Sequence, residues 1–242
     1  MLTVCIKAEH LKLKRSFIWI AFFLLPLIPA LMGSQNYLNN LGVLSAEWYS
    51  LWTQESLFYS NFFFAPMIAI YCGYLWRVEN FGHNRNALLT YPVPVRNIFL
   101  GKMAAAFSVS ILTQVWMFFL FLVTGKAVGL TGLPPAPIFF WMLRGTLAAL
   151  AITALQTLLA MVIRSFALPV GLSAVGSILG LVAVNSEKAF LYPYSLLILG
   201  MNANRDTDMV DSGILFFASS LFYLILFAFL GIWILKKSDV KA

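Results

Sequence analysis

Apolar residues fill most of the chain in six long runs, and polar residues gather between them. A helix needs about 20 apolar residues to cross a hydrocarbon layer of roughly 30 Å. We predict six transmembrane helices, at Phe17–Met32, Leu57–Trp76, Met103–Val123, Ile138–Ile163, Leu168–Val184 and Gly213–Leu235. The expected fold is therefore all-α, one polytopic membrane domain over residues 1–242.

Composition supports this class, because 61% of the residues are hydrophobic, only 10% are charged and the mean hydropathy is +0.87. A soluble domain of this length needs more charge to cover its surface. The net charge of +7 is divided among several loops, so we expect no nucleic-acid partner. Cys5 and Cys72 fit neither a disulfide framework nor the spacing of a metal site.

Basic residues separate by loop, which predicts the orientation. Twelve of the sixteen fall on one side, namely Lys7, Lys12, Lys14, Arg15, Arg77, Arg85, Arg96, Lys102, Arg164, Lys236, Lys237 and Lys241. Only Lys126, Lys188 and Arg205 fall on the other side, where acids such as Glu55 collect. Because cytoplasmic loops retain Lys and Arg, we expect both termini in the cytoplasm. No small-residue cleavage motif follows the first run, so we expect an uncleaved anchor.

Aromatic residues flank the predicted second and sixth helices. Trp48, Trp52 and Tyr59 lie at the outer edge of the second helix, and Trp76 and Trp233 lie at inner edges. Amphipathic rings favour the headgroup region of a bilayer, so we expect these side chains to be membrane anchors.

The stretch before the first helix alternates apolar and basic residues. A helix over residues 1–16 would have a cationic face and would lie along the cytoplasmic headgroups. The alternative is a simple orientation signal, for which the acidic Glu9 is unnecessary.

The cytoplasmic loop over residues 77–102 contains apolar residues between polar ones. Leu88 and Leu89 follow a polar stretch, and Pro92 and Pro94 end any helix there. Exposed leucines in a cytosolic loop indicate a docking surface for a soluble partner. The alternative is a helical hairpin that folds back onto the membrane.

An outer region over residues 185–212 contains a run too short to span. Residues 189–201 are apolar but would reach only about 20 Å as a helix, which favours a re-entrant segment. In the preceding helix Gly176 and Gly180 form a G-x-x-x-G pair, which permits close helix contact. Sequence leaves open whether that contact is within the chain or between subunits.

Few polar residues lie inside the predicted helices. Arg144 either snorkels outward or faces an internal cleft, where it would meet an anionic group or a carboxylate of the protein. Gln114 and Gln156 are weaker candidates for a substrate path and would also suit hydrogen bonds between helices.

The chain contains no phosphate-binding G-x-x-x-x-G-K-[ST] motif and no catalytic cluster, so we expect neither an enzyme nor a bound cofactor.

The chain resembles the permease subunits of ABC-2 type transporters. The features that carry the resemblance are the basic N-terminal stretch, the six apolar runs, the run before the last helix and an ordered set of loop residues. In the loop these are Glu79, Gly82, Leu88, Leu89, Pro92, Arg96 and Lys102. The phrases Leu57-Phe58-Tyr59-Ser60 and Pro193-Tyr194-Ser195-Leu196 resemble the lantibiotic-immunity and bacitracin-type branch.

The resemblance implies that the 77–102 loop, with Glu79, Gly82, Arg85, Leu88, Leu89, Pro92 and Arg96, couples the permease to a separate ABC ATPase. It implies two ATPase copies that bind ATP and Mg²⁺, a second permease, identical or different, and a bacterial plasma membrane. The expected substrate is a lantibiotic-like peptide antibiotic. The alternatives are another lipid-like substrate, or an immunity protein that binds its ligand without ATP.

Overall fold

The computed structural model describes residues 1–80, 84, 88, 90 and 92–237. All regular structure in these residues is helical. The helices are α1 (Leu2–Leu13), α2 (Ile18–Leu24), α3 (Leu27–Asn39), α4 (Glu47–Phe58), the π-helix η1 (Tyr59–Phe63), α5 (Phe64–Asn80), α7 (Val95–Ala127), α8 (Ala136–Val162), α9 (Ala167–Ala183), the 3₁₀ helix η2 (Ala189–Leu191), α10 (Ser195–Met201) and α11 (Gly213–Lys236).

Five helical stretches are long and apolar enough to cross a membrane: Ile18–Asn39, Glu47–Asn80, Val95–Ala127, Ala136–Val162 and Gly213–Lys236. They agree with five of the six predicted helices. The predicted helix Leu168–Val184 corresponds to α9, whose 17 residues reach only about 25 Å. This crossing, the fifth in chain order, therefore stays a prediction.

The first and second crossings differ from simple straight helices. Pro26 separates α2 from α3, because proline lacks the N–H that a continuous helix needs. The second crossing begins at Glu47 rather than at the predicted Leu57, because α4, η1 and α5 follow one another without a break.

The prediction that the aromatic residues around the second crossing are headgroup anchors is wrong for most of them. Trp48, Trp52, Tyr59 and Trp76 are at most 3% exposed, and they belong to the hydrophobic core. These residues lie within the continuous helical stretch α4–η1–α5 and not at its edge, and their rings pack inside the bundle. Trp233 alone among the five is exposed, at 46%.

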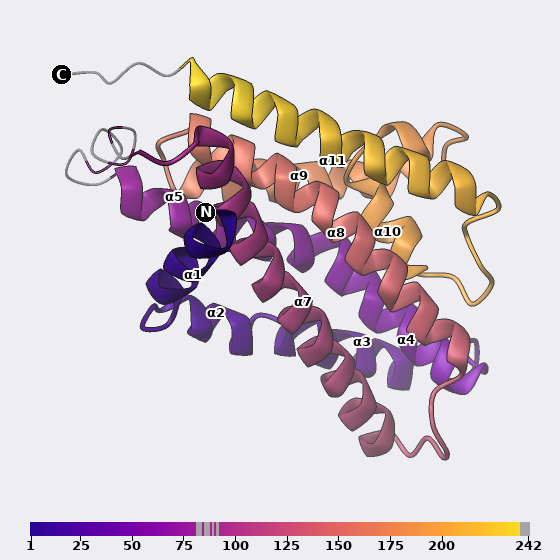
Figure 1. The fold of residues 1–242 in the computed structure, drawn as a ribbon. Coiled ribbons are helices and arrows are strands. Elements are labelled where there is room, and N and C mark those ends of the chain that lie inside the picture. The colour runs from indigo at the N-terminus through magenta and orange to yellow at the C-terminus, as the bar shows by residue number, and fades with distance from the viewer. Residues whose placement is uncertain (81–83, 85–87, 89, 91, 238–242) are drawn as a thin grey trace.

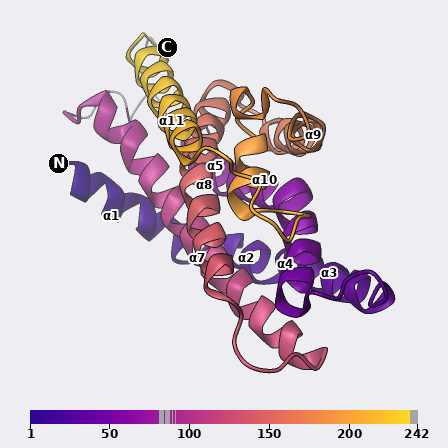
Figure 2. The ribbon, with the colours of Figure 1, turned by 90° about the vertical axis from the view of Figure 1, so that its right-hand side faces the viewer.

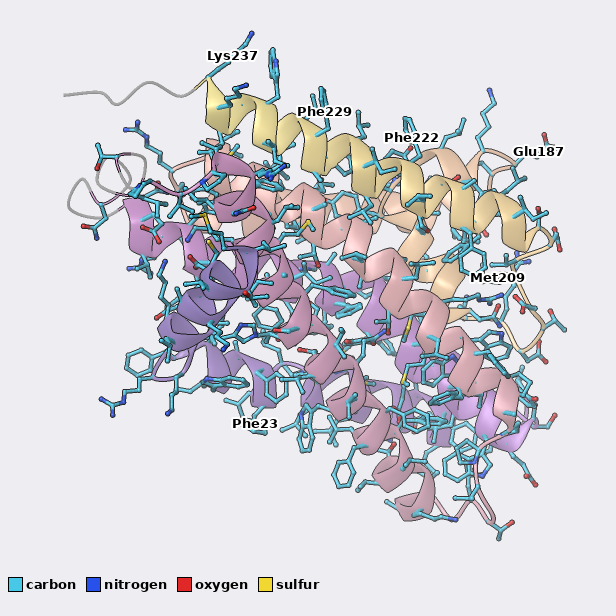
Figure 3. All side chains as sticks on the ribbon, in the orientation of Figure 1. Phe23, Glu187, Met209, Phe222, Phe229 and Lys237 are labelled. Atoms are coloured by element: carbon cyan, nitrogen blue, oxygen red, sulfur yellow. The ribbon has the colours of Figure 1, made fainter. Side chains whose placement is uncertain are left out.

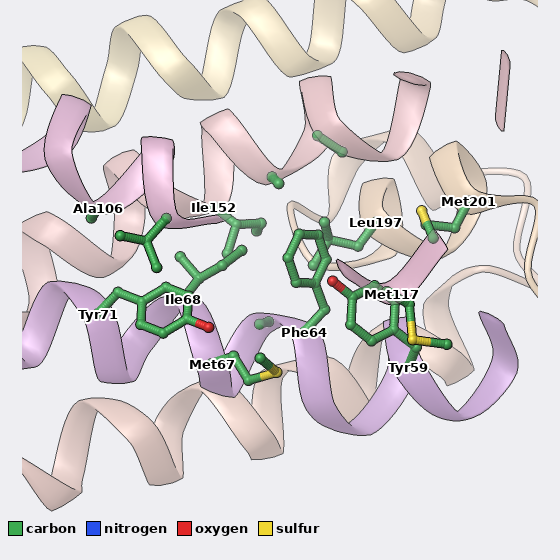
Figure 4. Packing of buried hydrophobic residues seen from close by; sticks show 14 of the residues in the cluster. Tyr59, Phe64, Met67, Ile68, Tyr71, Ala106, Met117, Ile152, Leu197 and Met201 are labelled. Atoms are coloured by element: carbon green, nitrogen blue, oxygen red, sulfur yellow. The ribbon is translucent and has the colours of Figure 1, made fainter. Parts of the chain in front are cut away.

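The core lies around α5, which is covered on several sides by α7, α8 and α9. In the close view, Phe64 of α5 lies beside Leu197 of α10, and Ile68 of α5 lies towards Ile152 of α8 (Figure 4). In the side view α5 and α8 lie inside the bundle, and α1 and α11 lie on its flanks (Figure 2).

Helix α11 turns a broad apolar face outward. Phe222 and Phe229 point away from the bundle, and Lys237 lies at its end (Figure 3). Both phenylalanines are more than half exposed, as expected for side chains that contact lipid.

One end of the bundle gathers α1, the end of α5, the start of α7 and the end of α11 (Figure 1). These are segments that the basic residues assign to the cytoplasm. The fold therefore groups them on one side, and we refer to this side as the inner end.

Candidate coupling site

Four charged residues form a closed ring at the inner end of the bundle, which we call the ion ring: Glu9 and Lys12 of α1, Glu79 of α5 and Lys102 of α7. Lys12 Nζ lies 2.7 Å from Glu9 Oε1 and 2.5 Å from Glu79 Oε1. Lys102 Nζ lies 3.0 Å from Glu9 Oε2 and 3.0 Å from Glu79 Oε1. Each charge therefore has two neighbours of opposite sign.

The ion ring is buried. The side chain of Lys102 has no exposed surface, and its ammonium also donates to the carbonyl of Leu75 at 3.1 Å. The ammonium lies 5.1 Å from the ring centroid of Trp76. Buried charges persist only when ion pairs and hydrogen bonds replace the lost water, and this arrangement supplies both.

Local sequence makes the approach of the three helices possible. Glu9 and Lys12 are three residues apart, so they lie on the same face of α1. Gly101 lets α7 approach α1, because a Cβ there would come within 2.9 Å of the Cβ of Cys5. This close contact lies next to Lys102 in the chain and one turn of α1 before Glu9.

Lys12 is the member of the ion ring that retains contact with water. Burial lowers its pKa, but the hydrogen bonds to the Glu79 and Glu9 carboxylates outweigh this and leave the pKa above its ordinary value. Lys12 is thus held in its charged form, which the two carboxylates require.

The loop residues predicted to couple the permease to an ATPase differ in their exposure. Glu79 is buried in the ion ring, so it holds the loop's first end and does not face outward. Leu88 is half-buried and packs against the core. Pro92 and Arg96 are exposed. Gly82, Arg85 and Leu89 lie outside the described residues.

Arg144 pairs with a carboxylate of the same chain at the opposite end of the bundle. Its Nη1 and Nη2 donate to Asp208 Oδ2 and Oδ1 at 3.0 and 2.8 Å. Trp141 Nε1 donates to the same carboxylate at 3.3 Å. The Asp208 side chain is 49% exposed, so Arg144 meets a carboxylate of the protein near the surface of that end.

The two glutamines hydrogen-bond across the bundle. Gln114 Nε2 lies 3.3 Å from Thr146 Oγ1 of α8, and Gln156 Nε2 donates to Tyr194 Oη at 2.8 Å. Both side chains are buried and join α7 to α8 or α8 to the segment before α10.

The glycine pair of α9 packs against the same chain. A Cβ on Gly176 would lie 2.5 Å from the Tyr194 ring, and one on Gly180 would lie 3.2 Å from the backbone nitrogen of Ser195. The G-x-x-x-G pair thus seats the segment leading into α10, whose seven residues are all buried.

The ion pair at the outer end gives a pH-dependent prediction. Burial raises the pKa of Asp208, but the hydrogen bonds from Arg144 and Val210 outweigh it and leave the pKa below its usual 3.8. A carboxyl with a lowered pKa stabilises the fold above its unfolded pKa and loses that contribution as pH falls through the folded one.

We expect Asp208→Asn to lower the thermal unfolding midpoint in detergent at neutral pH. The difference from wild type should be constant above about pH 4 and shrink below it. Arg144→Gln should behave in the same way, because it breaks the same pair. A difference that persists unchanged at lower pH would contradict the role of the Asp208 charge.

Sequence reasoning missed that Glu9, Lys12 and Lys102 share one site. The sequence did contain an indication of this site. Glu9 is an acid in an otherwise basic stretch, and a stretch that only set the orientation would not need it. Sequence reasoning also missed the contact of Glu55 with Thr124, since Glu55 was placed outside the second crossing.

The fold and the ion ring define a multi-pass helical membrane protein whose N-terminal helix is joined by ion pairs to the helices at both ends of the 77–102 loop. A model of ABC-2 family transporter proteins matches residues 5–180. The chain therefore belongs to the ABC-2 transporter family and is a membrane permease subunit. Proteins of this family generally work with an ABC ATPase. Neither a curated protein nor a solved structure gives a significant match.

Proposed function

We propose that the chain is the membrane subunit of an exporter driven by a separate ABC ATPase that docks on the 77–102 loop. The ion ring is the observation that supports this best. It fixes α1 to the end of α5 and the start of α7, the helices on either side of the loop. A force applied to the loop then moves three helices together.

The proposal extends to the arrangement in the membrane. Both termini lie in the cytoplasm, α9 forms a further crossing that is the fifth of six in chain order, and α10 belongs to a re-entrant segment shielded by α8 and α9. A re-entrant segment needs such cover because its backbone groups cannot meet lipid unsatisfied. The transporter contains a second permease and two ATPase copies, which bind ATP and Mg²⁺, and it lies in a bacterial plasma membrane.

The substrate that we propose is an amphipathic molecule, in the first place a lantibiotic-like peptide removed from the membrane for self-protection. The sequence phrases named above support this branch. ATP-driven closure of the ATPases would tilt α5 and α7 through the ion ring and expose an apolar route for the substrate.

Arg96 provides the test of docking, because it is exposed at the start of α7 beside the loop. We expect Arg96→Glu to reduce co-purification of the ATPase in mild detergent by about tenfold, as reversal of a rim charge at an interface does. Arg205→Glu is the matched control, since Arg205 is exposed at the other end of the bundle. Recovery of no ATPase with the wild-type chain would instead favour a protein that binds its ligand without ATP.

A further inference from the structure

Glu55 of α4 is a fully buried acid that neither the ion ring nor the Arg144 pair uses. Its Oε1 accepts a hydrogen bond from Thr124 Oγ1 of α7 at 2.5 Å. Its Oε2 has no hydrogen-bond partner in the described part of the chain. An ionisable side chain inside a membrane bundle is expensive, and such residues commonly mark functional sites.

The neighbouring elements bring no cation to this carboxyl within the described residues. Gly33 of α3 lies against the Glu55 backbone. The nearest base on α7, Lys126, lies over the Trp48 ring and donates to the carbonyl of Leu130. Glu47, at the start of α4, is itself acidic. The positive charge that would complement Glu55 is therefore missing from its surroundings.

A cleft of about 300 Å³ lies at the outer end of the bundle, and Gln54 lines it whereas Glu55 does not. It is lined by residues 43–46, by Ser50, Thr53 and Gln54 of α4, and by residues 204–207. Gln54 directly precedes Glu55 and accepts a hydrogen bond from Asn36. Arg205 and Asp206 contribute one charge of each sign, so the formal charges in the lining cancel.

The π-helix η1 begins four residues after Glu55 and offers a way to turn it into the cleft. A π-helical turn holds one residue more than an α-helical turn. Suppose that the extra residue moves from η1 to the N-terminal side of Glu55. Each residue between these two places then takes the position of the residue before it, which turns its side chain by about 100° around the helix axis. Glu55 then takes the position that Gln54 holds now.

The η1 segment is suited to such a shift. Tyr59 Oη and Asn61 Oδ1 are buried in it, and neither has a hydrogen-bond partner in the part of the chain that the structure describes. Trp48 and Trp52 lie on the N-terminal side of the shifted residues and can keep their contacts with Phe121.

We propose that Glu55 is the binding residue for a positively charged amphipathic substrate, presented in the outer cleft by a one-residue shift of the π-helix. With Glu55 in the lining, the cleft has a net negative charge and a carboxylate at its wall. An ammonium or guanidinium group complements that carboxylate. The inference rests on the proposed export function and narrows its substrate class to cations.

The test compares dodecylammonium with uncharged dodecanol on the full chain in phosphatidylcholine nanodiscs, with tryptophan fluorescence as the binding signal. We expect Glu55→Gln to weaken saturable dodecylammonium binding about tenfold and to leave dodecanol unchanged, since one charge-assisted contact is lost. Glu47→Gln is the matched control, because it removes the same charge from an exposed position of the same helix.

Equal dodecylammonium binding by wild type and Glu55→Gln, or no saturable binding at all, would overturn the proposal. The assay needs no ATPase, so its outcome is separate from that of the docking test. If an ATPase co-purifies but the cation preference is absent, only the role of Glu55 is lost. If the chain prefers dodecylammonium but no ATPase is found, the cation site at Glu55 is supported and the proposal of ATP-driven export is contradicted.

A register variant tests the shift itself. Deletion of Gln54 together with insertion of alanine between Glu55 and Ser56 places Glu55 at the position that Gln54 holds now and leaves the rest of the helix in register. We expect this variant to bind dodecylammonium more tightly than wild type, and Glu55→Gln to remove the gain. A folded register variant with unchanged or weaker cation affinity would contradict the shift, and the Glu55→Gln comparison stands without it.

Discussion

Replacing Lys102 with methionine is expected to lower the free energy of unfolding by about 3–5 kcal/mol, the loss typical of a broken buried ion pair. Methionine fills a similar volume, but Glu9 and Glu79 would then share only Lys12, which is partly exposed. Two carboxylates would remain at a buried site with one cation. Denaturant unfolding of the purified chain in detergent measures the change.

Two further variants distinguish the effect of breaking the ion ring on stability from the effect of removing a positive charge in general. Lys7→Met removes an exposed lysine from α1 and should change stability by no more than about 0.5 kcal/mol. Lys102→Met combined with Glu79→Gln should be less destabilising than the sum of the single changes, because members of one ion network are not additive. Strict additivity would mean that the four residues do not act together.

Gly33→Ala is expected to destabilise the protein by about 1–3 kcal/mol through overpacking between α3 and α4. A Cβ at Gly33 would lie 2.5 Å from the Cα of Glu55 and 2.6 Å from its backbone nitrogen. Backbone atoms cannot rotate away as a flexible side chain can, so the helices must separate. The same unfolding measurement reports the effect.

Gly171 supplies the comparison for this prediction. It lies in α9, and a Cβ there would meet no atom within 4 Å. Gly171→Ala should therefore leave stability unchanged or raise it by about 0.5–1 kcal/mol, because alanine favours the helix. A loss at Gly171 as large as that at Gly33 would show that the close contact of α3 and α4 is not the cause.

The apolar runs were sufficient to predict most of the helices, since a span needs a long stretch without charge. The grouping of basic residues also matched the ends of the bundle, because the segments that carry Lys12, Arg77 and Lys102 all reach the inner end. These features depend on local composition, which a single sequence contains.

The ion ring and the buried acid could not be predicted in this way, because each depends on contacts between distant parts of the chain. Glu9 and Lys102 are 93 residues apart, and Glu55 and Thr124 are 69 apart. Trp52 illustrates the same limit. Its amphipathic ring suits a headgroup region, but the indole donates instead to the buried carbonyl of Met201 at 2.8 Å.

Site-specific photo-crosslinking in native membranes shows directly whether the 77–102 loop couples the permease to an ATPase. Benzoylphenylalanine would replace Pro92, exposed beside the loop's second end, and in a second variant Leu133, exposed at the other end of the bundle. If the loop is the docking site, we expect an ABC ATPase in the crosslinked product from position 92 and not from position 133. Absence of an ATPase from the position 92 product, or equal recovery from both positions, would contradict it.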